Sequence, residues 1–252
     1  MIGKLPLVEP AARRLPVASL LFVVLATALY ALPGTAAWLQ YDRTAILHGE
    51  VWRVLTGHLV HWSGDQLFWD GLALGFLGWL CEREEVASFL RCFVLSASLI
   101  SLTLWFAAPE MATYRGLSGI DSALFALVAV RLGREAFLDR QWSKLTLIAI
   151  VAGGFALKLA YEFASGATLF VDSSAGGMTP MPLAHVVGAL VGIICGLWPV
   201  LAPESMSRFV DHVGGRRPLD LDRDEGQAAG VRPLNRRSVG QAASLPHERP
   251  SR

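Results

Sequence analysis

The sequence predicts an all-α membrane protein, a bundle of six spanning helices with both chain termini in the cytoplasm. Its 252 residues are 53% hydrophobic and 17% charged, and the mean hydropathy is +0.45. Soluble domains carry about 25% charged residues, so this composition favours a chain that folds in a bilayer. The net charge of +1 gives no reason to expect nucleic acid as a partner.

Six apolar stretches are long enough to cross a hydrocarbon core about 30 Å thick, which takes roughly 20 helical residues. The first follows Arg13 and Arg14, a pattern that also fits a signal peptide, but no good small-residue cleavage site comes after it. We therefore predict a retained span. The six stretches are Pro16–Leu32, Gln66–Cys81, Val86–Ala107, Leu117–Leu132, Leu145–Phe163 and Leu183–Leu201.

Lys and Arg residues in the short loops predict the orientation, because they concentrate on the cytoplasmic side. The loops 33–65, 108–116 and 164–182 contain only three such residues, Arg43, Arg53 and Arg115. The N-terminal segment and the loops on its side of the membrane contain more Lys and Arg residues. Residues 1–15 are therefore expected to be a cytoplasmic segment and residues 16–203 the membrane domain. Residues 204–252 are rich in Arg, Asp, Gly, Pro and Ser, which predicts a disordered cytoplasmic tail.

Two reactive side chains are predicted at the same depth of the membrane. Ser118 lies about one residue inside the fourth stretch and His185 about two residues inside the sixth, and both stretches begin on the non-cytoplasmic side. Gly188 and Gly192 follow His185 on one helical face, and this spacing of small residues lets helices approach closely. A Ser hydroxyl beside a His imidazole can form a nucleophile and general base.

These motifs resemble the rhomboid family of intramembrane serine proteases. Gly116-Leu117-Ser118-Gly119 is similar to the family's nucleophile motif, and Ala184-His185 with Gly188 and Gly192 resembles its base-bearing helix. The resemblance implies Ser118 as the nucleophile and His185 as the general base of a dyad. No metal or cofactor is expected, because the sequence has no ligand cluster of the HExxH or Cys-pair kind. The resemblance also implies a membrane-anchored protein as the substrate.

Within the family, the chain looks closest to the rhombosortase branch. The segment Tyr41-Asp42-Arg43, Trp52-Arg53 and the run to His61 carry this likeness. The branch is implied to process bacterial envelope proteins whose C-terminal tails contain Gly-Gly, an apolar helix and basic residues. The expected location is therefore the bacterial inner membrane, with the active site towards the periplasm.

One departure concerns the oxyanion-binding residues of the family, which are implied to be a His, a second His five residues later and an Asn four further on. His61 fits, but the next positions are Gln66 and Asp70. Gln66 can still donate a hydrogen bond, whereas an ionised Asp70 cannot. Either Asp70 is protonated or it has another partner, with His58 and Lys158 as candidates; backbone N–H groups at Ser118 and Gly119 also favour an anion.

Three further acidic or basic groups lie within the predicted spans. Asp121 lies one helical turn after Ser118 and is a candidate to orient His185, although a structural polar contact is the favoured interpretation. Lys158 and Glu162 are spaced i, i+4 near the outer end of the fifth stretch, which predicts a surface or rim ion pair, with a role in gating left open. Three cysteines at unrelated spacings predict neither a disulfide framework nor a zinc site.

The preferred function is hydrolysis of a peptide bond in or near a substrate transmembrane helix. Gln66 and Asp70 motivate one alternative, an inactive rhomboid-like protein that binds membrane helices without cutting them. A small transporter is the other alternative, and it is disfavoured because the two halves of the chain show no repeat. The sequence fixes neither the native substrate nor the oligomeric state.

Overall fold

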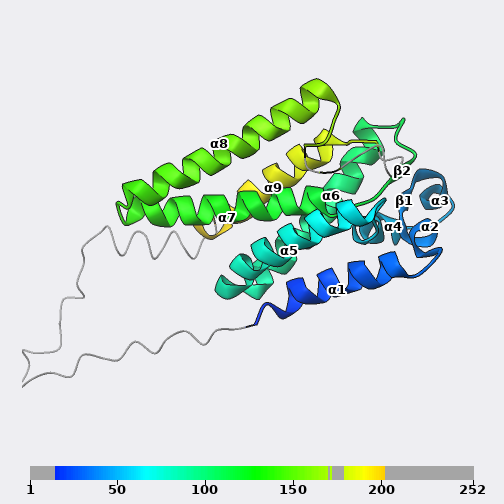
Figure 1. The fold of residues 1–252 in the computed structure, drawn as a ribbon, viewed down its shortest axis with the longest axis horizontal. Helices are drawn as coiled ribbons and strands as arrows, with labels where there is room; N and C mark the ends of the chain where they lie inside the picture. The colour runs from blue at the N-terminus through cyan, green and yellow to red at the C-terminus, as the bar shows by residue number, and fades with distance from the viewer. Residues whose placement is uncertain (1–14, 170, 172–178, 202–252) are drawn as a thin grey trace, which may run out of the picture. The chain divides into compact units, whose positions relative to one another are not determined.

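Six long helices coincide with the six apolar stretches predicted from the sequence (Figure 1). The computed structural model describes residues 15–169, 171 and 179–201, which belong to one compact unit, residues 1–206. The predicted all-α class is confirmed for this part of the chain. The long helices are α1 (Val17–Ala31), α5 (Gly64–Glu84), α6 (Val86–Ala107), α7 (Ser118–Leu138), α8 (Trp142–Ser165) and α9 (Pro182–Leu201).

Two of the described helices, α6 and α8, are long and apolar enough to cross a membrane by length and composition. Helix α1 and the part of α9 up to Trp198 are shorter apolar helices. That all six helices span a bilayer, with both termini in the cytoplasm, stays a prediction. The predicted N-terminal segment (all but residue 15) and the predicted tail from residue 204 lie outside the described residues.

Successive connections alternate between the two ends of the bundle (Figure 1). One end carries the segment from α1 to α5, the segment from α6 to α7 and the described parts of the connection from α8 to α9. The opposite end carries the tight turn at Glu85 and the turn between α7 and α8. The first end also holds the short elements α2 (Thr35–Leu39), β1 (Tyr41–Asp42), α3 (Arg43–Leu47), α4 (Arg53–Thr56), η1 (Gly57–Leu59) and β2 (Thr113–Tyr114).

A two-residue ladder joins the first loop to the segment that leads into α7. Strands β1 and β2 pair antiparallel, with Tyr41 opposite Tyr114, and the Gly116 N–H donates to the Gly57 carbonyl at 3.3 Å. Arg53 is buried and donates to the carbonyls of Ala37 and Gln40, which braces the same loop from within. The backbone before Ser118 is thus held by segments far away in sequence.

The start of α1 is fixed by a carboxylate from α5. Glu82 is 4% exposed, and its two oxygens accept the N–H groups of Ala18 and Ser19 at 3.0 and 2.6 Å. The first N–H groups of a helix lack intrahelical acceptors and favour negative charge. Glu82 therefore acts as an N-cap supplied from another helix, and it fixes α1 against α5.

Helices α7 and α9 make the closest contact in the bundle, at glycines of α9. A Cβ atom at Gly188 would overlap the Gly119 carbonyl oxygen, and one at Gly192 would overlap the Ala123 carbonyl oxygen. Only residues without a side chain let the two backbones meet at this distance. This close approach sets how far His185 of α9 lies from Ser118 of α7.

Candidate functional site

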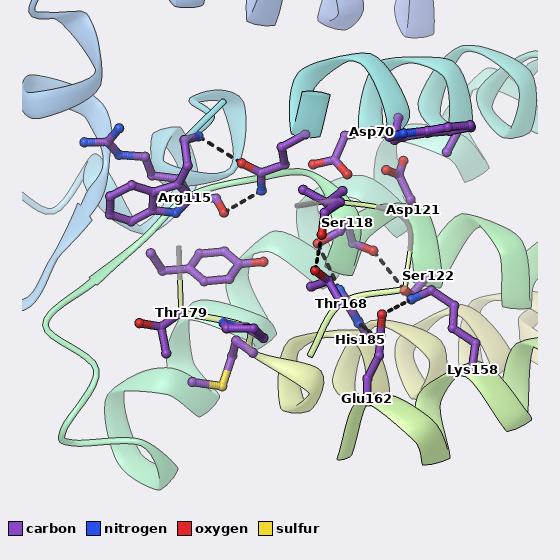
Figure 2. A pocket seen from close by; sticks show the side chains of 18 of the residues that line it. Asp70, Arg115, Ser118, Asp121, Ser122, Lys158, Glu162, Thr168, Thr179 and His185 are labelled. Atoms are coloured by element: carbon purple, nitrogen blue, oxygen red, sulfur yellow. Dashed lines mark hydrogen bonds and ion pairs between the residues drawn. The ribbon is translucent and has the colours of Figure 1, made fainter. Parts of the chain in front are cut away.

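A cavity of about 790 Å³ lies at the end of the bundle that carries the first loop, bounded by residues of α5, α7, α8 and α9 and of the segment before α7. Much of its wall is apolar, with Trp69, Leu77, Phe125 and Phe155 among the lining residues. The polar lining residues gather around Ser118 (Figure 2). Apolar walls with a few convergent polar groups are typical of a binding or catalytic site.

Ser118 and His185 face each other across the contact between α7 and α9. The distance from Ser118 Oγ to His185 Nε2 is 3.0 Å, within hydrogen-bond range. Ser118 is the first residue of α7, and His185 lies in the first turn of α9, where Pro182 starts the helix. His185 is 8% exposed and Ser118 is partly exposed, and both side chains line the cavity.

The second ring nitrogen of His185 contacts Glu162, a residue of α8. His185 Nδ1 lies 2.9 Å from Glu162 Oε2, and Glu162 Oε1 accepts a hydrogen bond from Lys158 Nζ at 2.8 Å. The predicted pairing with Lys158 is present, but Glu162 is 2% exposed, so a place at the protein surface is wrong for its carboxylate. The missed signal was its place near the outer end of a span, at the depth predicted for Ser118 and His185.

Gln66 of α5 ties two loop segments together with its side-chain amide. Its Oε1 accepts the Trp62 N–H at 2.9 Å, and its Nε2 donates to the Arg115 carbonyl at 3.3 Å. Gly116 has a φ of +118°, and a Cβ atom there would overlap Gln66 Nε2. Only glycine fits this position, because it is both left-handed and in contact with the amide. Gln66 therefore supports the turn before Ser118 while also lining the cavity.

Asp70 binds the backbone directly before the serine. Its Oδ2 accepts the Leu117 N–H at 3.0 Å and lies 3.3 Å from His61 Nε2. The partners suggested from the sequence, His58 and Lys158, are wrong. His58 Nε2 contacts the Ala97 carbonyl and Ser101, and Lys158 binds Glu162. Burial lowers the pKa of His58 to about 4, so that this loop imidazole is neutral near pH 7.

Asp70→Ala is expected to loosen the turn before Ser118. It removes the acceptor of a buried N–H, which costs about 1–3 kcal/mol of stability, and the labelling rate of Ser118 by a fluorophosphonate should fall. Asp70→Asn keeps an acceptor oxygen, so its losses of stability and of labelling rate should both be smaller. Chemical denaturation in detergent and labelling kinetics measure the two effects, with the exposed Asp139→Asn as control; an Asp70→Ala protein as stable as wild type would contradict the assignment.

Asp121 is not the carboxylate that contacts His185. It lies one turn after Ser118, is 8% exposed and lines the cavity, but neither of its oxygens has a hydrogen-bond partner among the described residues. The neighbouring Ser122 donates to the Ser118 carbonyl at 2.8 Å, within the same helix. The structural polar contact favoured from the sequence is therefore also absent from the described part of the chain.

The cysteines and the other potential metal ligands form no metal-binding cluster in the described part of the chain. Cys81, Cys92 and Cys195 are buried free thiols, and in the described ranges no three His, Cys, Asp or Glu side chains gather as a metal-binding group. Glu162 is bound by Lys158 and His185, and Asp121 has no hydrogen-bond partner among the described residues. The polar groups of the cavity are those of an acid–base pair and its surroundings.

Taken together, these features define a class: a helical protein with apolar helices long enough for a membrane, and a Ser–His pair in a cavity between them. The sequence matches the family described as the Rhomboid domain over residues 48–201, more than half of the chain. The chain belongs to the rhomboid family. It is therefore an integral membrane protein of a family that generally acts as serine proteases on transmembrane substrates within the bilayer, although some members are inactive.

Proposed function

We propose that this protein is an intramembrane serine endopeptidase in which Ser118 is the nucleophile and His185 the general base. The observation that carries the proposal is the 3.0 Å distance from Ser118 Oγ to His185 Nε2 in a cavity with apolar walls. A helix hides its carbonyl groups in hydrogen bonds, so the substrate segment must first unwind. The cavity of about 790 Å³ has room for such a segment beside the serine.

The reaction follows from this geometry. Ser118 Oγ attacks the carbonyl carbon of the scissile bond, and its proton moves to His185 Nε2. When the C–N bond breaks, Nε2 returns that proton to the leaving amine. Water then attacks the carbonyl carbon of the Ser118 ester and gives a proton to His185 Nε2. When the ester bond breaks, Nε2 returns this proton to Ser118 Oγ, and the new carboxylate leaves.

The oxyanion is stabilised by backbone N–H groups of Ser118 and Gly119 in this proposal. They lie in the first turn of α7, where N–H groups have no intrahelical acceptor and the helix dipole favours negative charge. Gln66 accepts from Trp62 with Oε1 and donates one of its two Nε2 protons to the Arg115 carbonyl, and Asp70 accepts from Leu117. These two residues and His61 therefore support the turn that presents Ser118, and the backbone carries most of the charge stabilisation.

The substrate class that we propose is a C-terminal sorting tail: Gly-Gly, an apolar helix and a basic end. The basis is the likeness of the first loop to the rhombosortase branch. Glycines lower the free-energy cost of unwinding a helix near the cut, and the apolar helix matches a membrane-embedded site. The proposed location is the bacterial inner membrane, with the cavity towards the periplasm.

The test is labelling of the detergent-purified protein with a fluorescent fluorophosphonate, followed by cleavage of a reporter that ends in such a tail. Wild type should label at Ser118 and cut the reporter near Gly-Gly. A reporter with Gly-Gly replaced by Leu-Leu should be cut more slowly. Folded wild type without label or cleavage would instead favour the inactive binder that Gln66 and Asp70 first suggested.

A further inference from the structure

A continuous chain of polar contacts runs from the serine to α8 (Figure 2). Ser118 Oγ lies 3.0 Å from His185 Nε2, His185 Nδ1 lies 2.9 Å from Glu162 Oε2, and Glu162 Oε1 lies 2.8 Å from Lys158 Nζ. Each of the two ring nitrogens of His185 thus has its own partner. A neutral imidazole that donates from Nδ1 must present Nε2 as an acceptor, which is the form that a general base needs.

Burial distinguishes Glu162 from the other charged groups of α8. Among the described residues of α8, Glu162 is the one that is buried, while apolar side chains such as Leu147, Ile150 and Leu157 are exposed. A buried carboxylate is costly unless it is paired and hydrogen-bonded. Among the described residues, the Glu162 carboxylate is paired with Lys158 and His185 and has a longer contact of 3.4 Å from the Leu169 N–H. The His185 imidazole and the Lys158 ammonium group therefore hold the Glu162 carboxylate together.

The other charged groups around the imidazole are occupied elsewhere or lie out of reach. Asp70 of α5 binds the Leu117 N–H, and Asp121 of α7 has no hydrogen-bond partner among the described residues. Lys158 binds Glu162 rather than His185. Of the carboxylates that line the cavity, Glu162 is thus the one in contact with His185.

We propose that Glu162 is a positioning residue for His185, which makes the site a Ser118–His185–Glu162 triad, and that Lys158 orients the Glu162 carboxylate. This inference rests on the proposed protease function. The Nδ1 proton stays on His185 throughout, hydrogen-bonded to an ionised Glu162. When Nε2 takes the Ser118 proton, the imidazolium forms beside a negative charge in a cavity of low dielectric, where the attraction is strong.

The arrangement also makes the reactivity of Ser118 depend on α8. Helix α8 contributes Glu162 to His185 and Phe155 to Phe125, whose ring centroids lie 4.5 Å apart. Much of the rest of its described surface is exposed apolar residues. A displacement of α8 would therefore remove the carboxylate and leave a Ser–His pair without its third member.

The experiment compares fluorophosphonate labelling of purified wild type, Glu162→Gln, Glu162→Asp and Lys158→Met across a pH series. For Glu162→Gln the maximal labelling rate constant should fall by about 10²–10⁴-fold, with the half-saturating concentration within about threefold of wild type. The acid limb of the rate profile should move to lower pH, because an imidazolium without its carboxylate loses its proton more readily. Glu162→Asp should recover part of the labelling rate constant, and this rate constant should fall less in Lys158→Met than in Glu162→Gln.

Glu135→Gln is the matched control, because Glu135 is an exposed carboxylate that also pairs with a lysine, Lys144, away from the cavity. Its rate and pH profile should equal those of wild type. A folded Glu162→Gln protein with wild-type rate and acid limb would overturn the triad, while the loss of label in Ser118→Ala would still uphold the protease. Wild type without Ser118-dependent label would overturn the protease and, with it, the triad.

A second measurement covers the case in which Glu162 variants fail to fold. Wild type with ¹⁵N-labelled histidine should show a strongly deshielded Nδ1 proton from His185, the mark of an imidazole donating to a carboxylate. The signal should vanish in His185→Ala, and Ser118→Ala should keep it. A His185 ring that carries its proton on Nε2 near neutral pH would contradict the triad.

Discussion

Ser118→Ala is expected to abolish fluorophosphonate labelling and to lower reporter cleavage by about 10⁴–10⁶-fold, the scale on which serine hydrolases respond to loss of the nucleophile. Ala has no oxygen to attack the carbonyl, so the acyl-enzyme cannot form. His185→Ala should lower cleavage by a similar factor, because it removes the imidazole nitrogen that lies 3.0 Å from Ser118 Oγ and takes its proton. The two losses together should be far from additive, since both residues serve one step.

Ser96→Ala is the matched control for the nucleophile. Ser96 is a buried serine of α6, and its hydroxyl donates to the carbonyls of Cys92 and Phe93 within its own helix. It does not line the cavity, so its variant should keep wild-type labelling and cleavage. Cleavage that survives Ser118→Ala in protein of equal purity would refute the assignment of Ser118.

Gly188→Val is expected to disrupt the pairing of α7 and α9 and with it the reactive serine. The new Cβ would overlap the Gly119 carbonyl oxygen, and backbone cannot move aside as a flexible side chain can. Overpacking alone costs about 1–3 kcal/mol, and a clash with backbone should reach at least the upper end. Thermal unfolding in detergent should show a lower midpoint, and the labelling rate of Ser118 should fall because His185 is displaced.

The sign of the stability change in a Gly→Ala variant distinguishes a steric clash from the effect of helix propensity. Gly154 of α8 has open space where a Cβ would stand, so Gly154→Ala should gain up to about 1 kcal/mol, as expected for Ala over Gly in a helix interior. Gly188→Ala should lose stability despite the same gain in propensity. Equal effects at the two positions would show that α7 and α9 do not meet as closely as the structure has them.

The sequence predicted the helices well because their signal is local. Each long apolar stretch became a helix, and the bounds of α6, Val86–Ala107, agree with the prediction at both ends. Helices α5, α7 and α8 extend beyond their apolar stretches, through polar residues such as Glu84, Arg134 and Lys144. Hydropathy marks the apolar part of a helix, whereas hydrogen bonding continues past it.

The role of Asp70 could not be read from the chain, because its partner is a backbone group. The Leu117 N–H lies 47 positions away in sequence, and no pattern of side chains predicts which backbone N–H in a turn needs an acceptor. The search for a partner among side chains therefore pointed to His58 and Lys158, both of which bind elsewhere. Buried backbone donors need acceptors as much as side chains do.

By itself, the sequence determined the helical class, the membrane composition and the two motifs that carry Ser118 and His185, since apolar length, Gly spacing and short motifs are properties of consecutive residues. Only the tertiary structure decided which carboxylate contacts His185. Asp121 is closer to Ser118 in sequence, but Glu162 reaches the imidazole at 2.9 Å from α8. The direction in which a side chain leaves its helix, and the neighbour it meets there, depend on how helices rotate and pack against each other, which a single sequence does not encode locally.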